Sequence, residues 1–349
     1  MHHAKVNVVG PVLAEEAAAQ HAARLSSFAV RANTRSVGGG NGGGGGGNGG
    51  DGDHVKETDK TILAAFLTAD PAVNIYAIGD LDPAVWDDCS WDGLRKKNPG
   101  RIEGDGGGGG GGGGLQAVAL TYRGLSVPAL QLLVDPLKPE LVRAAELLLT
   151  RMAPTLGGGR FEAHLNVGFE RIFQEAGFTV SAHPHLRMAA DSAGLERLKT
   201  AVSAPASAPT SSTATEKLPR RLTADDAEAC MELCSTLERS WFEPQCLAKG
   251  LYYGIYDSAA EATTLVAMAG THVVSTEYNV AALGNVVTRT EYRRRGYGRA
   301  VTRALCLALV DKGIRTVGLN VAASNGAAIS MYTSLHFKPV MEFVECDVN

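Results

Sequence analysis

The pattern of apolar and polar residues is clearest between residues 216 and 349, where strand-like and helix-like segments alternate. β-Branched and aromatic residues dominate 251–257 and 263–274, which predicts two strands, and a third predicted strand ends at Thr288. Beyond Gly298 the apolar residues recur at intervals of three and four, which predicts a helix. The residues of that apolar stripe are Val301, Ala304, Leu305, Ala308 and Leu309.

Two further elements follow this helix, which Gly313 is expected to end. Residues 316–321 alternate apolar and polar side chains and predict a strand, and residues 324–335 predict a shorter helix. A strand, a helix and a second strand in this order predict a parallel pair joined by a right-handed crossover. We therefore expect an α+β fold with a mixed sheet in this part of the chain.

Low-complexity segments divide the chain into ordered parts. Nearly pure glycine runs occupy residues 38–50 and 106–114, and such runs bury no side chains and behave as flexible coil. Residues 200–215 are rich in Pro, Ala, Ser and Thr, which is typical of a linker. The expected organisation is a Gly-rich, disordered or targeting segment at 1–53, a first domain at 54–199 with a Gly-rich insertion at 104–114, a linker at 200–217 and a second domain at 218–349.

The bulk composition argues against several classes of protein. A net charge of −4 and a pI near 6.2 disfavour a dedicated nucleic-acid binder. The six cysteines form no CxxC pair and lack the partner residues of a metal site. No apolar run approaches the roughly 20 residues that span a bilayer. We expect no metal, no nucleic-acid partner and no membrane partner, and the sequence leaves the oligomeric state open.

The first 35 residues bear on the location of the protein. They are rich in Ala and carry Arg24, Arg31 and Arg35, as organelle transit peptides often do. Glu15 and Glu16 weigh against this reading, because such peptides are poor in acidic residues. We expect a cytoplasmic protein, with the chloroplast or mitochondrion as the alternative.

Positive charge is concentrated between the third predicted strand and the helix. Three consecutive arginines, Arg293–Arg295, directly precede Gly296 and Gly298. The start of a helix presents unpaired backbone N–H groups and the positive end of the helix dipole. Because glycine lacks a Cβ atom, a pyrophosphate can approach these groups closely, and the arginines offset its charge. We interpret the loop as a site for a phosphorylated ligand, with a nucleic-acid patch and a solvated turn as the alternatives.

The spacing Arg-x-x-Gly-x-Gly, at Arg293, Gly296 and Gly298, resembles the acyl-CoA loop of the GNAT acyltransferase superfamily. A second stretch is similar to that superfamily's Asn-x-x-Ala-x-x-x-Tyr-x-x-x-x-Phe signature, except that His336 replaces the usual Gly before the Phe. Its residues are Asn325, Ala328, Tyr332 and Phe337. The resemblance implies an acetyl-CoA-dependent N-acetyltransferase with a GNAT fold, in which two parallel central strands splay apart.

The resemblance also implies how acetyl-CoA is held. The pantetheine arm is expected to pair with the strand edge at Val286, Val287 and Thr288, and the pyrophosphate with the backbone amides of Arg294–Arg299. The other residues expected to bind the cofactor are Arg293, Arg294, Arg295, Gly296, Tyr297, Gly298, Arg299 and Asn325. Tyr332 is expected to protonate the departing thiolate, because a phenol of pKa about 10 can donate to a thiolate of pKa about 8.5.

The base that takes a proton from the acceptor amine is not defined by a motif. Some members of the superfamily carry a Glu at the position that Ala282 occupies here. We name Glu277 as the catalytic base, with His272, Glu238 and a water relayed from backbone carbonyls as alternatives. The acceptor is expected to be a small-molecule or peptide amine that attacks the thioester directly in a ternary complex.

The N-terminal half shows a weaker copy of the same signature. Phe173, Gly177 and Phe178 repeat the spacing around Tyr332, but Phe173 lacks a hydroxyl group and no Arg-x-x-Gly-x-Gly precedes it. The resemblance suggests a degenerate GNAT-like half in a tandem protein, with an unrelated α+β domain as the alternative. For the whole chain, the second hypothesis is a non-catalytic acyl-CoA-binding module, and a nucleic-acid binder is a more remote third.

Overall fold

The computed structural model describes residues 52–96, 114–200, 218–236, 242–257 and 263–349. The expected N-terminal segment up to Asp51, most of the Gly-rich insertion, and residues 201–217 of the expected linker lie outside the described residues, as does Glu238. The described residues belong to one compact unit, Gly50–Asn349. Among them, no helix is long and apolar enough to cross a membrane.

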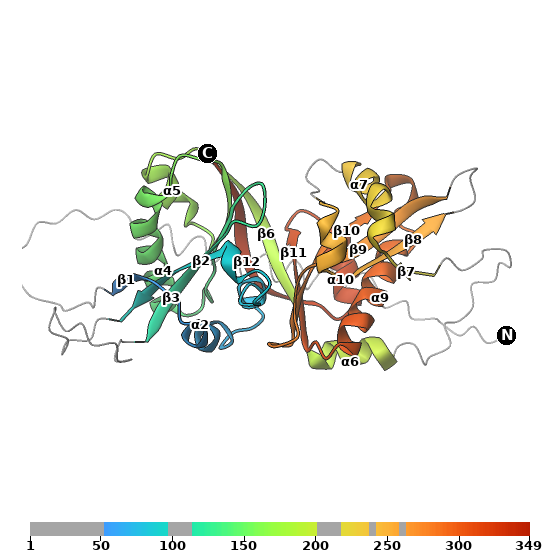
Figure 1. Ribbon diagram of the computed structural model, residues 1–349, viewed down its shortest axis with the longest axis horizontal. Helices are drawn as coiled ribbons and strands as arrows, with labels where there is room; N and C mark the ends of the chain where they lie inside the picture. Colours follow the sequence, from blue (N-terminus) through green and yellow to red (C-terminus); the bar gives the residue numbers. More distant parts are fainter. Residues whose placement is uncertain (1–51, 97–113, 201–217, 237–241, 258–262) are drawn as a thin grey trace, which may run out of the picture. The chain divides into compact units, whose positions relative to one another are not determined.

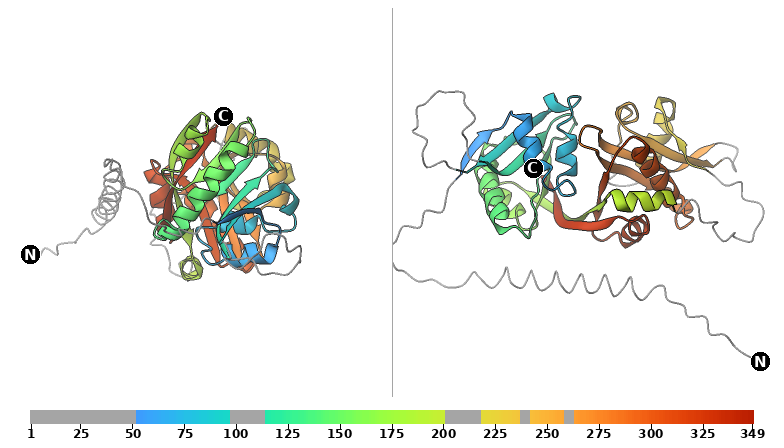
Figure 2. Two further views of the ribbon diagram at one scale, coloured as in Figure 1. Left: turned by 90° about the vertical axis from the view of Figure 1, so that its left-hand side faces the viewer. Right: turned by 90° about the horizontal axis from the view of Figure 1, so that it is seen from below.

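Within the described residues, the two halves of the chain contain the same kinds of element in the same order. The first half runs β1 (Asp53–Lys56), α2 (Lys60–Leu67), α3 (Ile75–Gly79), β2 (Cys89–Arg95), β3 (Leu115–Tyr122), β4 (Ala129–Leu132), α4 (Pro139–Met152), β5 (Phe161–Leu165), α5 (Glu170–Glu175), β6 (Val180–Ala190). The second half runs β7 (Arg220–Arg221), α7 (Ala227–Ser235), α8 (Gln245–Lys249), β8 (Tyr252–Asp257), β9 (Thr264–Ser275), β10 (Val280–Thr288), α9 (Tyr297–Asp311), β11 (Thr316–Ala322), α10 (Gly326–Ser334), β12 (Lys338–Val348). An additional helix, α6 (Ser192–Thr200), follows β6 and packs beside α9 (Figure 2). This repetition indicates two copies of one fold.

All the strands lie in one mixed sheet of order β1-β2-β3-β4-β5-β12-β6-β11-β10-β9-β8-β7. In each half, the first four strands are antiparallel to their neighbours. The fourth and fifth strands are parallel and are joined by a helix; these pairs are β4 with β5 and β10 with β11. The parallel pair and crossover helix that the hydrophobic pattern predicts between 280 and 322 are therefore present, and the expected mixed sheet is confirmed.

The last strand of each half pairs with the other half. β12 lies beside β5 of the first half, β6 lies beside β11 of the second half, and β6 and β12 pair with each other (Figure 1). The β6–β12 pairing is long, from Lys338 opposite Ala189 to Val348 opposite Val180. The two halves have therefore exchanged their final strands, and each half's sheet is completed by the other.

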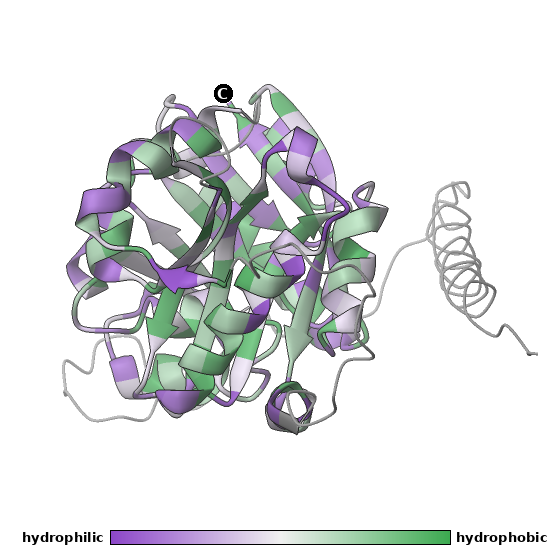
Figure 3. Ribbon diagram, turned by 90° about the vertical axis from the view of Figure 1, so that its right-hand side faces the viewer, coloured by the Kyte–Doolittle hydropathy of each residue, from purple (hydrophilic) through white to green (hydrophobic). Residues whose placement is uncertain are grey.

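Local sequence signals explain several of these elements. Thr223 and Asp226 form a capping box, in which the Asp226 carboxylate accepts the Thr223 amide at 2.8 Å, before α7 begins. The stripe Val301, Leu305 and Leu309 places one face of α9 in the core against β9, β10 and β11. Figure 3 shows the resulting distribution, with apolar residues gathered along the interior strands.

Helix α3 of the first half packs against the sheet of both halves. Ile75, Tyr76 and Ile78 share one buried cluster with Trp91, Val118 and Leu120 of the first half and with Val280 and Ala282 of β10. The approach is close, because a Cβ atom on Gly79 would lie 1.6 Å from a methyl carbon of Val273. The first half therefore contributes side chains to the surroundings of β10.

Candidate functional site

The parallel strands β10 and β11 separate partway along their length. Their pairing ends at Leu283 opposite Leu319, although β10 continues to Thr288 and β11 continues to Ala322. The splay expected of the central strands is therefore present. An extended ligand can pair with the strand edge that the separation leaves open.

A β-bulge shapes the part of β10 beyond this point. The register against β9 shifts between Gly284 and Val287, and Asn285 takes a positive φ of 50°. The Asn285 amide donates to the Tyr252 hydroxyl at 3.1 Å, which fixes the bulge. Of the residues expected to pair with pantetheine, Val286 therefore lies within the bulge and Val287 and Thr288 follow it, all beyond the last parallel pair with β11.

The loop after β10 leads into α9 through two residues with positive φ. Arg294 has φ 61° and Gly296, the N-cap of α9, has φ 84°. No side chain caps this helix, and a Cβ on Gly296 would contact nothing within 4 Å. Among the described residues, the first amide after Arg293 with a backbone carbonyl partner is that of Ala300, which donates to Gly296 at 2.9 Å. The amides of Arg294–Arg299 are thus placed to receive an anion.

The arginine side chains of the loop remain exposed. Arg293 donates through Nε to the Thr288 carbonyl at 3.2 Å, and the Arg295 guanidinium lies 5.2 Å from the ring centre of Tyr292. Within the described residues, none of Arg293, Arg294 and Arg295 forms an ion pair with a carboxylate. Their positive charge is therefore not cancelled by the described carboxylates.

Helix α10 positions the second motif. Asn325 is the N-cap, and its side-chain oxygen accepts the Ala328 amide at 3.1 Å. Tyr332 faces the core, with its ring centre 5.9 Å from that of Phe337. Burial raises the pKa of the Tyr332 hydroxyl well above its ordinary value of 10. The structure thus gives Asn325 a capping role, and its contact with the cofactor stays a prediction.

The structure separates the candidate bases. Glu277 is exposed in the turn before β10, 3.7 Å from the Lys60 ammonium group, at the opposite end of the paired segment from the splay. Ala282 is fully buried beneath α3. His272 instead lies directly over Gly284, the residue after the last parallel pair, where a Cβ would sit 2.0 Å from its Nε2 atom.

One neighbour of the site was missed from the sequence. Tyr76 of α3 lies with its ring centre 6.5 Å from that of His272, and its hydroxyl donates to the Leu283 carbonyl at 3.4 Å. Nothing in the local sequence marks Tyr76, because its position follows from the packing of the first half on β10. The apolar run 75–78 predicts only a buried element there.

The corresponding region of the first half is closed. β4 and β5 stay paired along the whole of β4, ending at Leu132 opposite Leu165. Just beyond, the buried Asn166 side chain accepts the Val134 amide at 3.0 Å and donates to the Val134 carbonyl at 2.8 Å. Asn166 precedes Phe173 by the same spacing as Asn325 precedes Tyr332, a signal available in the sequence. The described residues of this half therefore leave no open edge between β4 and β5 for a cofactor arm.

A histidine and two carboxylates come together near the exchanged strands. Ligand atoms of Glu162, His164 and Glu345 lie within 4.8 Å of one another. However, His164 Nε2 is 2.8 Å from the Glu162 carboxylate, a hydrogen-bond distance, and its buried Nδ1 has no partner. A metal-ligating histidine normally donates its second ring nitrogen to a partner. We interpret the group as a hydrogen-bonded cluster, and the absence of a metal from this protein stays a prediction.

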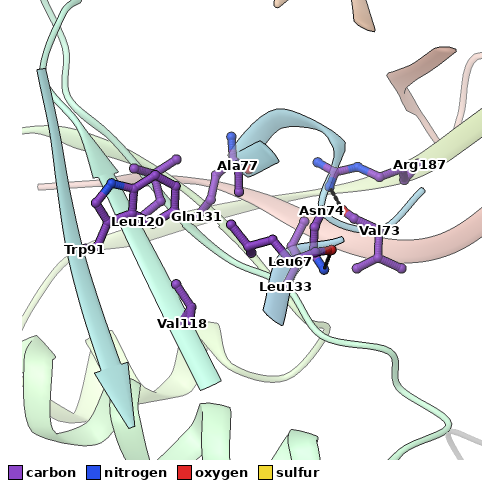
Figure 4. A pocket seen from close by; sticks show the side chains of 10 residues that line it. All are labelled: Leu67, Val73, Asn74, Ala77, Trp91, Val118, Leu120, Gln131, Leu133 and Arg187. Carbon is purple, nitrogen blue, oxygen red and sulfur yellow. Dashed lines mark hydrogen bonds between the residues drawn. The ribbon is translucent and has the colours of Figure 1, made fainter. Parts of the chain in front are cut away.

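A small cavity lies under α3 in the first half (Figure 4). The buried Arg187 lines it and donates to the Val73 carbonyl. The other lining residues are Leu67, Asn74, Ala77, Trp91, Val118, Leu120, Gln131 and Leu133. Its volume of about 10 Å³ admits roughly one water molecule. It cannot hold a ligand the size of acetyl-CoA.

Comparisons with known proteins bear on the family and on the fold. Residues 219–337 match the family model described as acetyltransferase (GNAT) family. No curated protein matches the chain. A Drosophila protein of known structure is 12% identical, with 86% of this chain and 99% of that chain covered and a TM-score of 0.57, which shows a shared fold across both halves.

Two further solved structures are similar at lower TM-scores. The GCN5-related N-acetyltransferase from Kribbella flavida is 18% identical, covers 66% of this chain and 86% of its own, and has a TM-score of 0.42. A tandem GNAT protein from the clavulanic acid biosynthesis pathway is 15% identical, with 86% and 98% covered and a TM-score of 0.48.

Proposed function

We propose that the protein transfers an acetyl group from acetyl-CoA to a primary amine, because residues 219–337 match the family model of the GNAT acetyltransferases. The observation that carries the proposal is the parting of β10 and β11 after Leu283, beside a helix N-terminus that Gly296 leaves open. A strand edge and an anion site next to each other fit the two ends of a pantetheine diphosphate.

The diphosphate of acetyl-CoA is proposed to bind the amides of Arg294–Arg299. Gly298 lies close to the end of β10, where a Cβ atom would be 3.2 Å from the Thr288 hydroxyl oxygen, a tight contact that glycine avoids. Arg293, Arg294 and Arg295 add positive charge around the phosphates. The pantetheine arm is proposed to continue along the open edge of β10, at Val286, Val287 and Thr288.

Tyr332 is the proposed proton donor to the sulfur of coenzyme A. Its raised pKa keeps the hydroxyl protonated at neutral pH, so the proton is present when the thiolate leaves. The reaction forms a bond from the amine nitrogen to the acyl carbon and breaks the carbon–sulfur bond. The neutral amine must lose one proton in this step and the sulfur must gain one, and an ammonium acceptor must lose a further proton before it attacks.

The acceptor is proposed to be a small molecule or peptide with a primary amine. An ammonium group of pKa about 10.4 is neutral in roughly one part in 2,500 at pH 7, so proton removal is a real requirement of the transfer. Glu277 lies away from the point where β10 and β11 separate, so a base for the reaction must lie closer to that point.

Two measurements on the full chain test the proposal. Acetyl-CoA binding is followed by calorimetry, and release of free thiol is followed across a panel of primary amines. We expect binding, and thiol release that depends on one class of amine. Binding without release for any amine would favour a non-catalytic acyl-CoA-binding module, an alternative that Ala282 in place of the usual Glu supports. Absence of binding would contradict both.

A further inference from the structure

His272 stands where the two parallel strands part. The pairing of β9 with β10 passes from Val273 directly to Thr271, so His272 is the extra residue of a β-bulge. A bulge turns a side chain out of the regular alternation of its strand. The imidazole ring consequently lies over Gly284, with Nε2, Cδ2 and Cε1 all within 2.3 Å of where a Cβ would be. Only glycine leaves room for the ring in this position.

A side chain of the first half, Tyr76, lies at the position where β10 and β11 separate. The Tyr76 hydroxyl donates to the carbonyl of Leu283 on β10, and the backbone of Asn320 on β11 is near enough to lower the pKa of Tyr76. These two residues adjoin the end of the parallel pairing. Tyr76 therefore occupies the apex of the splay, and His272 lies next to it on the side of β9.

The surroundings of His272 favour the neutral ring. Solvent reaches the side chain, but the protein packed around it lowers its pKa below the ordinary value of about 6.5 through desolvation. The titratable groups that act on it are Glu162, which opposes this shift, and His164, which adds to it, both on β5. Tyr76 on α3 is uncharged, because burial raises its pKa to about 12. A neutral imidazole has a free lone pair that can accept a proton.

We propose that His272 is the general base that removes the proton from the acceptor amine. This inference rests on the proposed function. His272 takes a proton from the bound ammonium group, and the neutral amine then bonds to the acyl carbon. The nitrogen loses its second proton to solvent, and Tyr332 gives a proton to the sulfur as the carbon–sulfur bond breaks. The imidazolium then returns its proton to the solvent that reaches the ring, and Tyr332 is reprotonated from solvent.

The test compares His272→Gln with Glu277→Gln on two acceptors. The first is a primary alkylamine that the wild type acetylates, which is almost wholly protonated at pH 7. The second is an alkoxyamine, which is neutral at that pH and needs no base before it attacks. For His272→Gln we expect kcat to fall about 100-fold or more with the alkylamine, and by far less with the alkoxyamine. Affinity for acetyl-CoA should stay unchanged, and Glu277→Gln should behave as the wild type.

Gly284→Ala provides an independent variant, because its methyl group displaces the ring without removing it. It should show the same selective loss with the alkylamine. Wild-type rates in His272→Gln, or equal losses with the two acceptors, would overturn the role of His272 and leave the proposed function standing. If the wild type released no thiol with any amine, the proposed function itself would fail.

Discussion

At the scale of single residues, the environment of Tyr332 keeps its hydroxyl protonated at neutral pH. The side chain is only 6% exposed, and burial rather than a neighbouring charge is the main cause of its raised pKa. A hydroxyl in this state is a hydrogen-bond donor throughout the physiological pH range. Its position on the buried face of α10 follows from the same apolar spacing that predicts the helix.

Tyr332→Phe should lower kcat by about 100-fold and leave the Kd for acetyl-CoA within a factor of two, because only the proton donor is lost. Stopped-flow or steady-state thiol release together with calorimetry measures both quantities. Tyr122→Phe, at the end of β3 in the first half, is a control that removes a hydroxyl from a residue with no role in binding or proton transfer. An unchanged kcat in Tyr332→Phe would exclude Tyr332 from the chemistry.

The pH dependence of the reaction should report His272. Because desolvation lowers its pKa, the ring is a competent base above about pH 6.5 and becomes protonated as the pH falls through the lowered value. We expect kcat/KM for an alkylamine, which stays protonated in solution over this range, to be level near pH 7 and to decline only below about 6.5. His272→Gln should lack this acid limb. A limb above pH 7 in the wild type would contradict the assignment.

At the scale of elements, the loop between β10 and α9 carries the binding prediction. Gly296 and Gly313 both have positive φ and open space where a Cβ would be, so Asp at either position introduces similar backbone strain. Gly296→Asp also places a negative charge where phosphate binds, and should weaken acetyl-CoA binding by about 100-fold or more. Gly313→Asp, at the end of α9, should leave it unchanged.

Titration of each variant by calorimetry, alongside its thermal midpoint, separates the two effects. Both midpoints should fall by a similar few degrees, because the strain is shared. Equal affinities for acetyl-CoA in the two variants would show that the phosphates bind elsewhere.

The elements that local patterns specify were predictable from the sequence, and those set by long-range pairing were not. The strand at 283–288, the glycine loop and the stripe from Val301 to Leu309 each follow from spacing alone. His272 was only one of several candidate bases in the sequence and Tyr76 was not a candidate, because the place of His272 depends on a bulge in β9 and that of Tyr76 on how α3 packs against β10. A shift of one residue in strand register leaves no mark in composition.

At the scale of the whole molecule, the exchange of final strands was equally hidden. The sequences of β6 and β12 are those of ordinary strands at the end of each half. Nothing in them distinguishes pairing within a half from pairing across the halves. In the structure, the second strand of each parallel pair has the last strand of the other half as its outer neighbour: β5 pairs with β12, and β11 pairs with β6. The first half, though closed to a cofactor at Asn166, thereby supports the sheet that forms the site.

This exchange predicts that the halves remain associated when the chain between them is cut. A protease site introduced between Thr200 and Leu218, followed by complete cleavage, should yield two fragments that co-elute in size-exclusion chromatography and still bind acetyl-CoA. The reason is that the β6–β12 and β6–β11 ladders and the buried α3 contacts do not depend on that connection. A variant without the inserted site, treated with the same protease, is the control. Fragments that separate without denaturant would show that the exchanged strands do not hold the halves together.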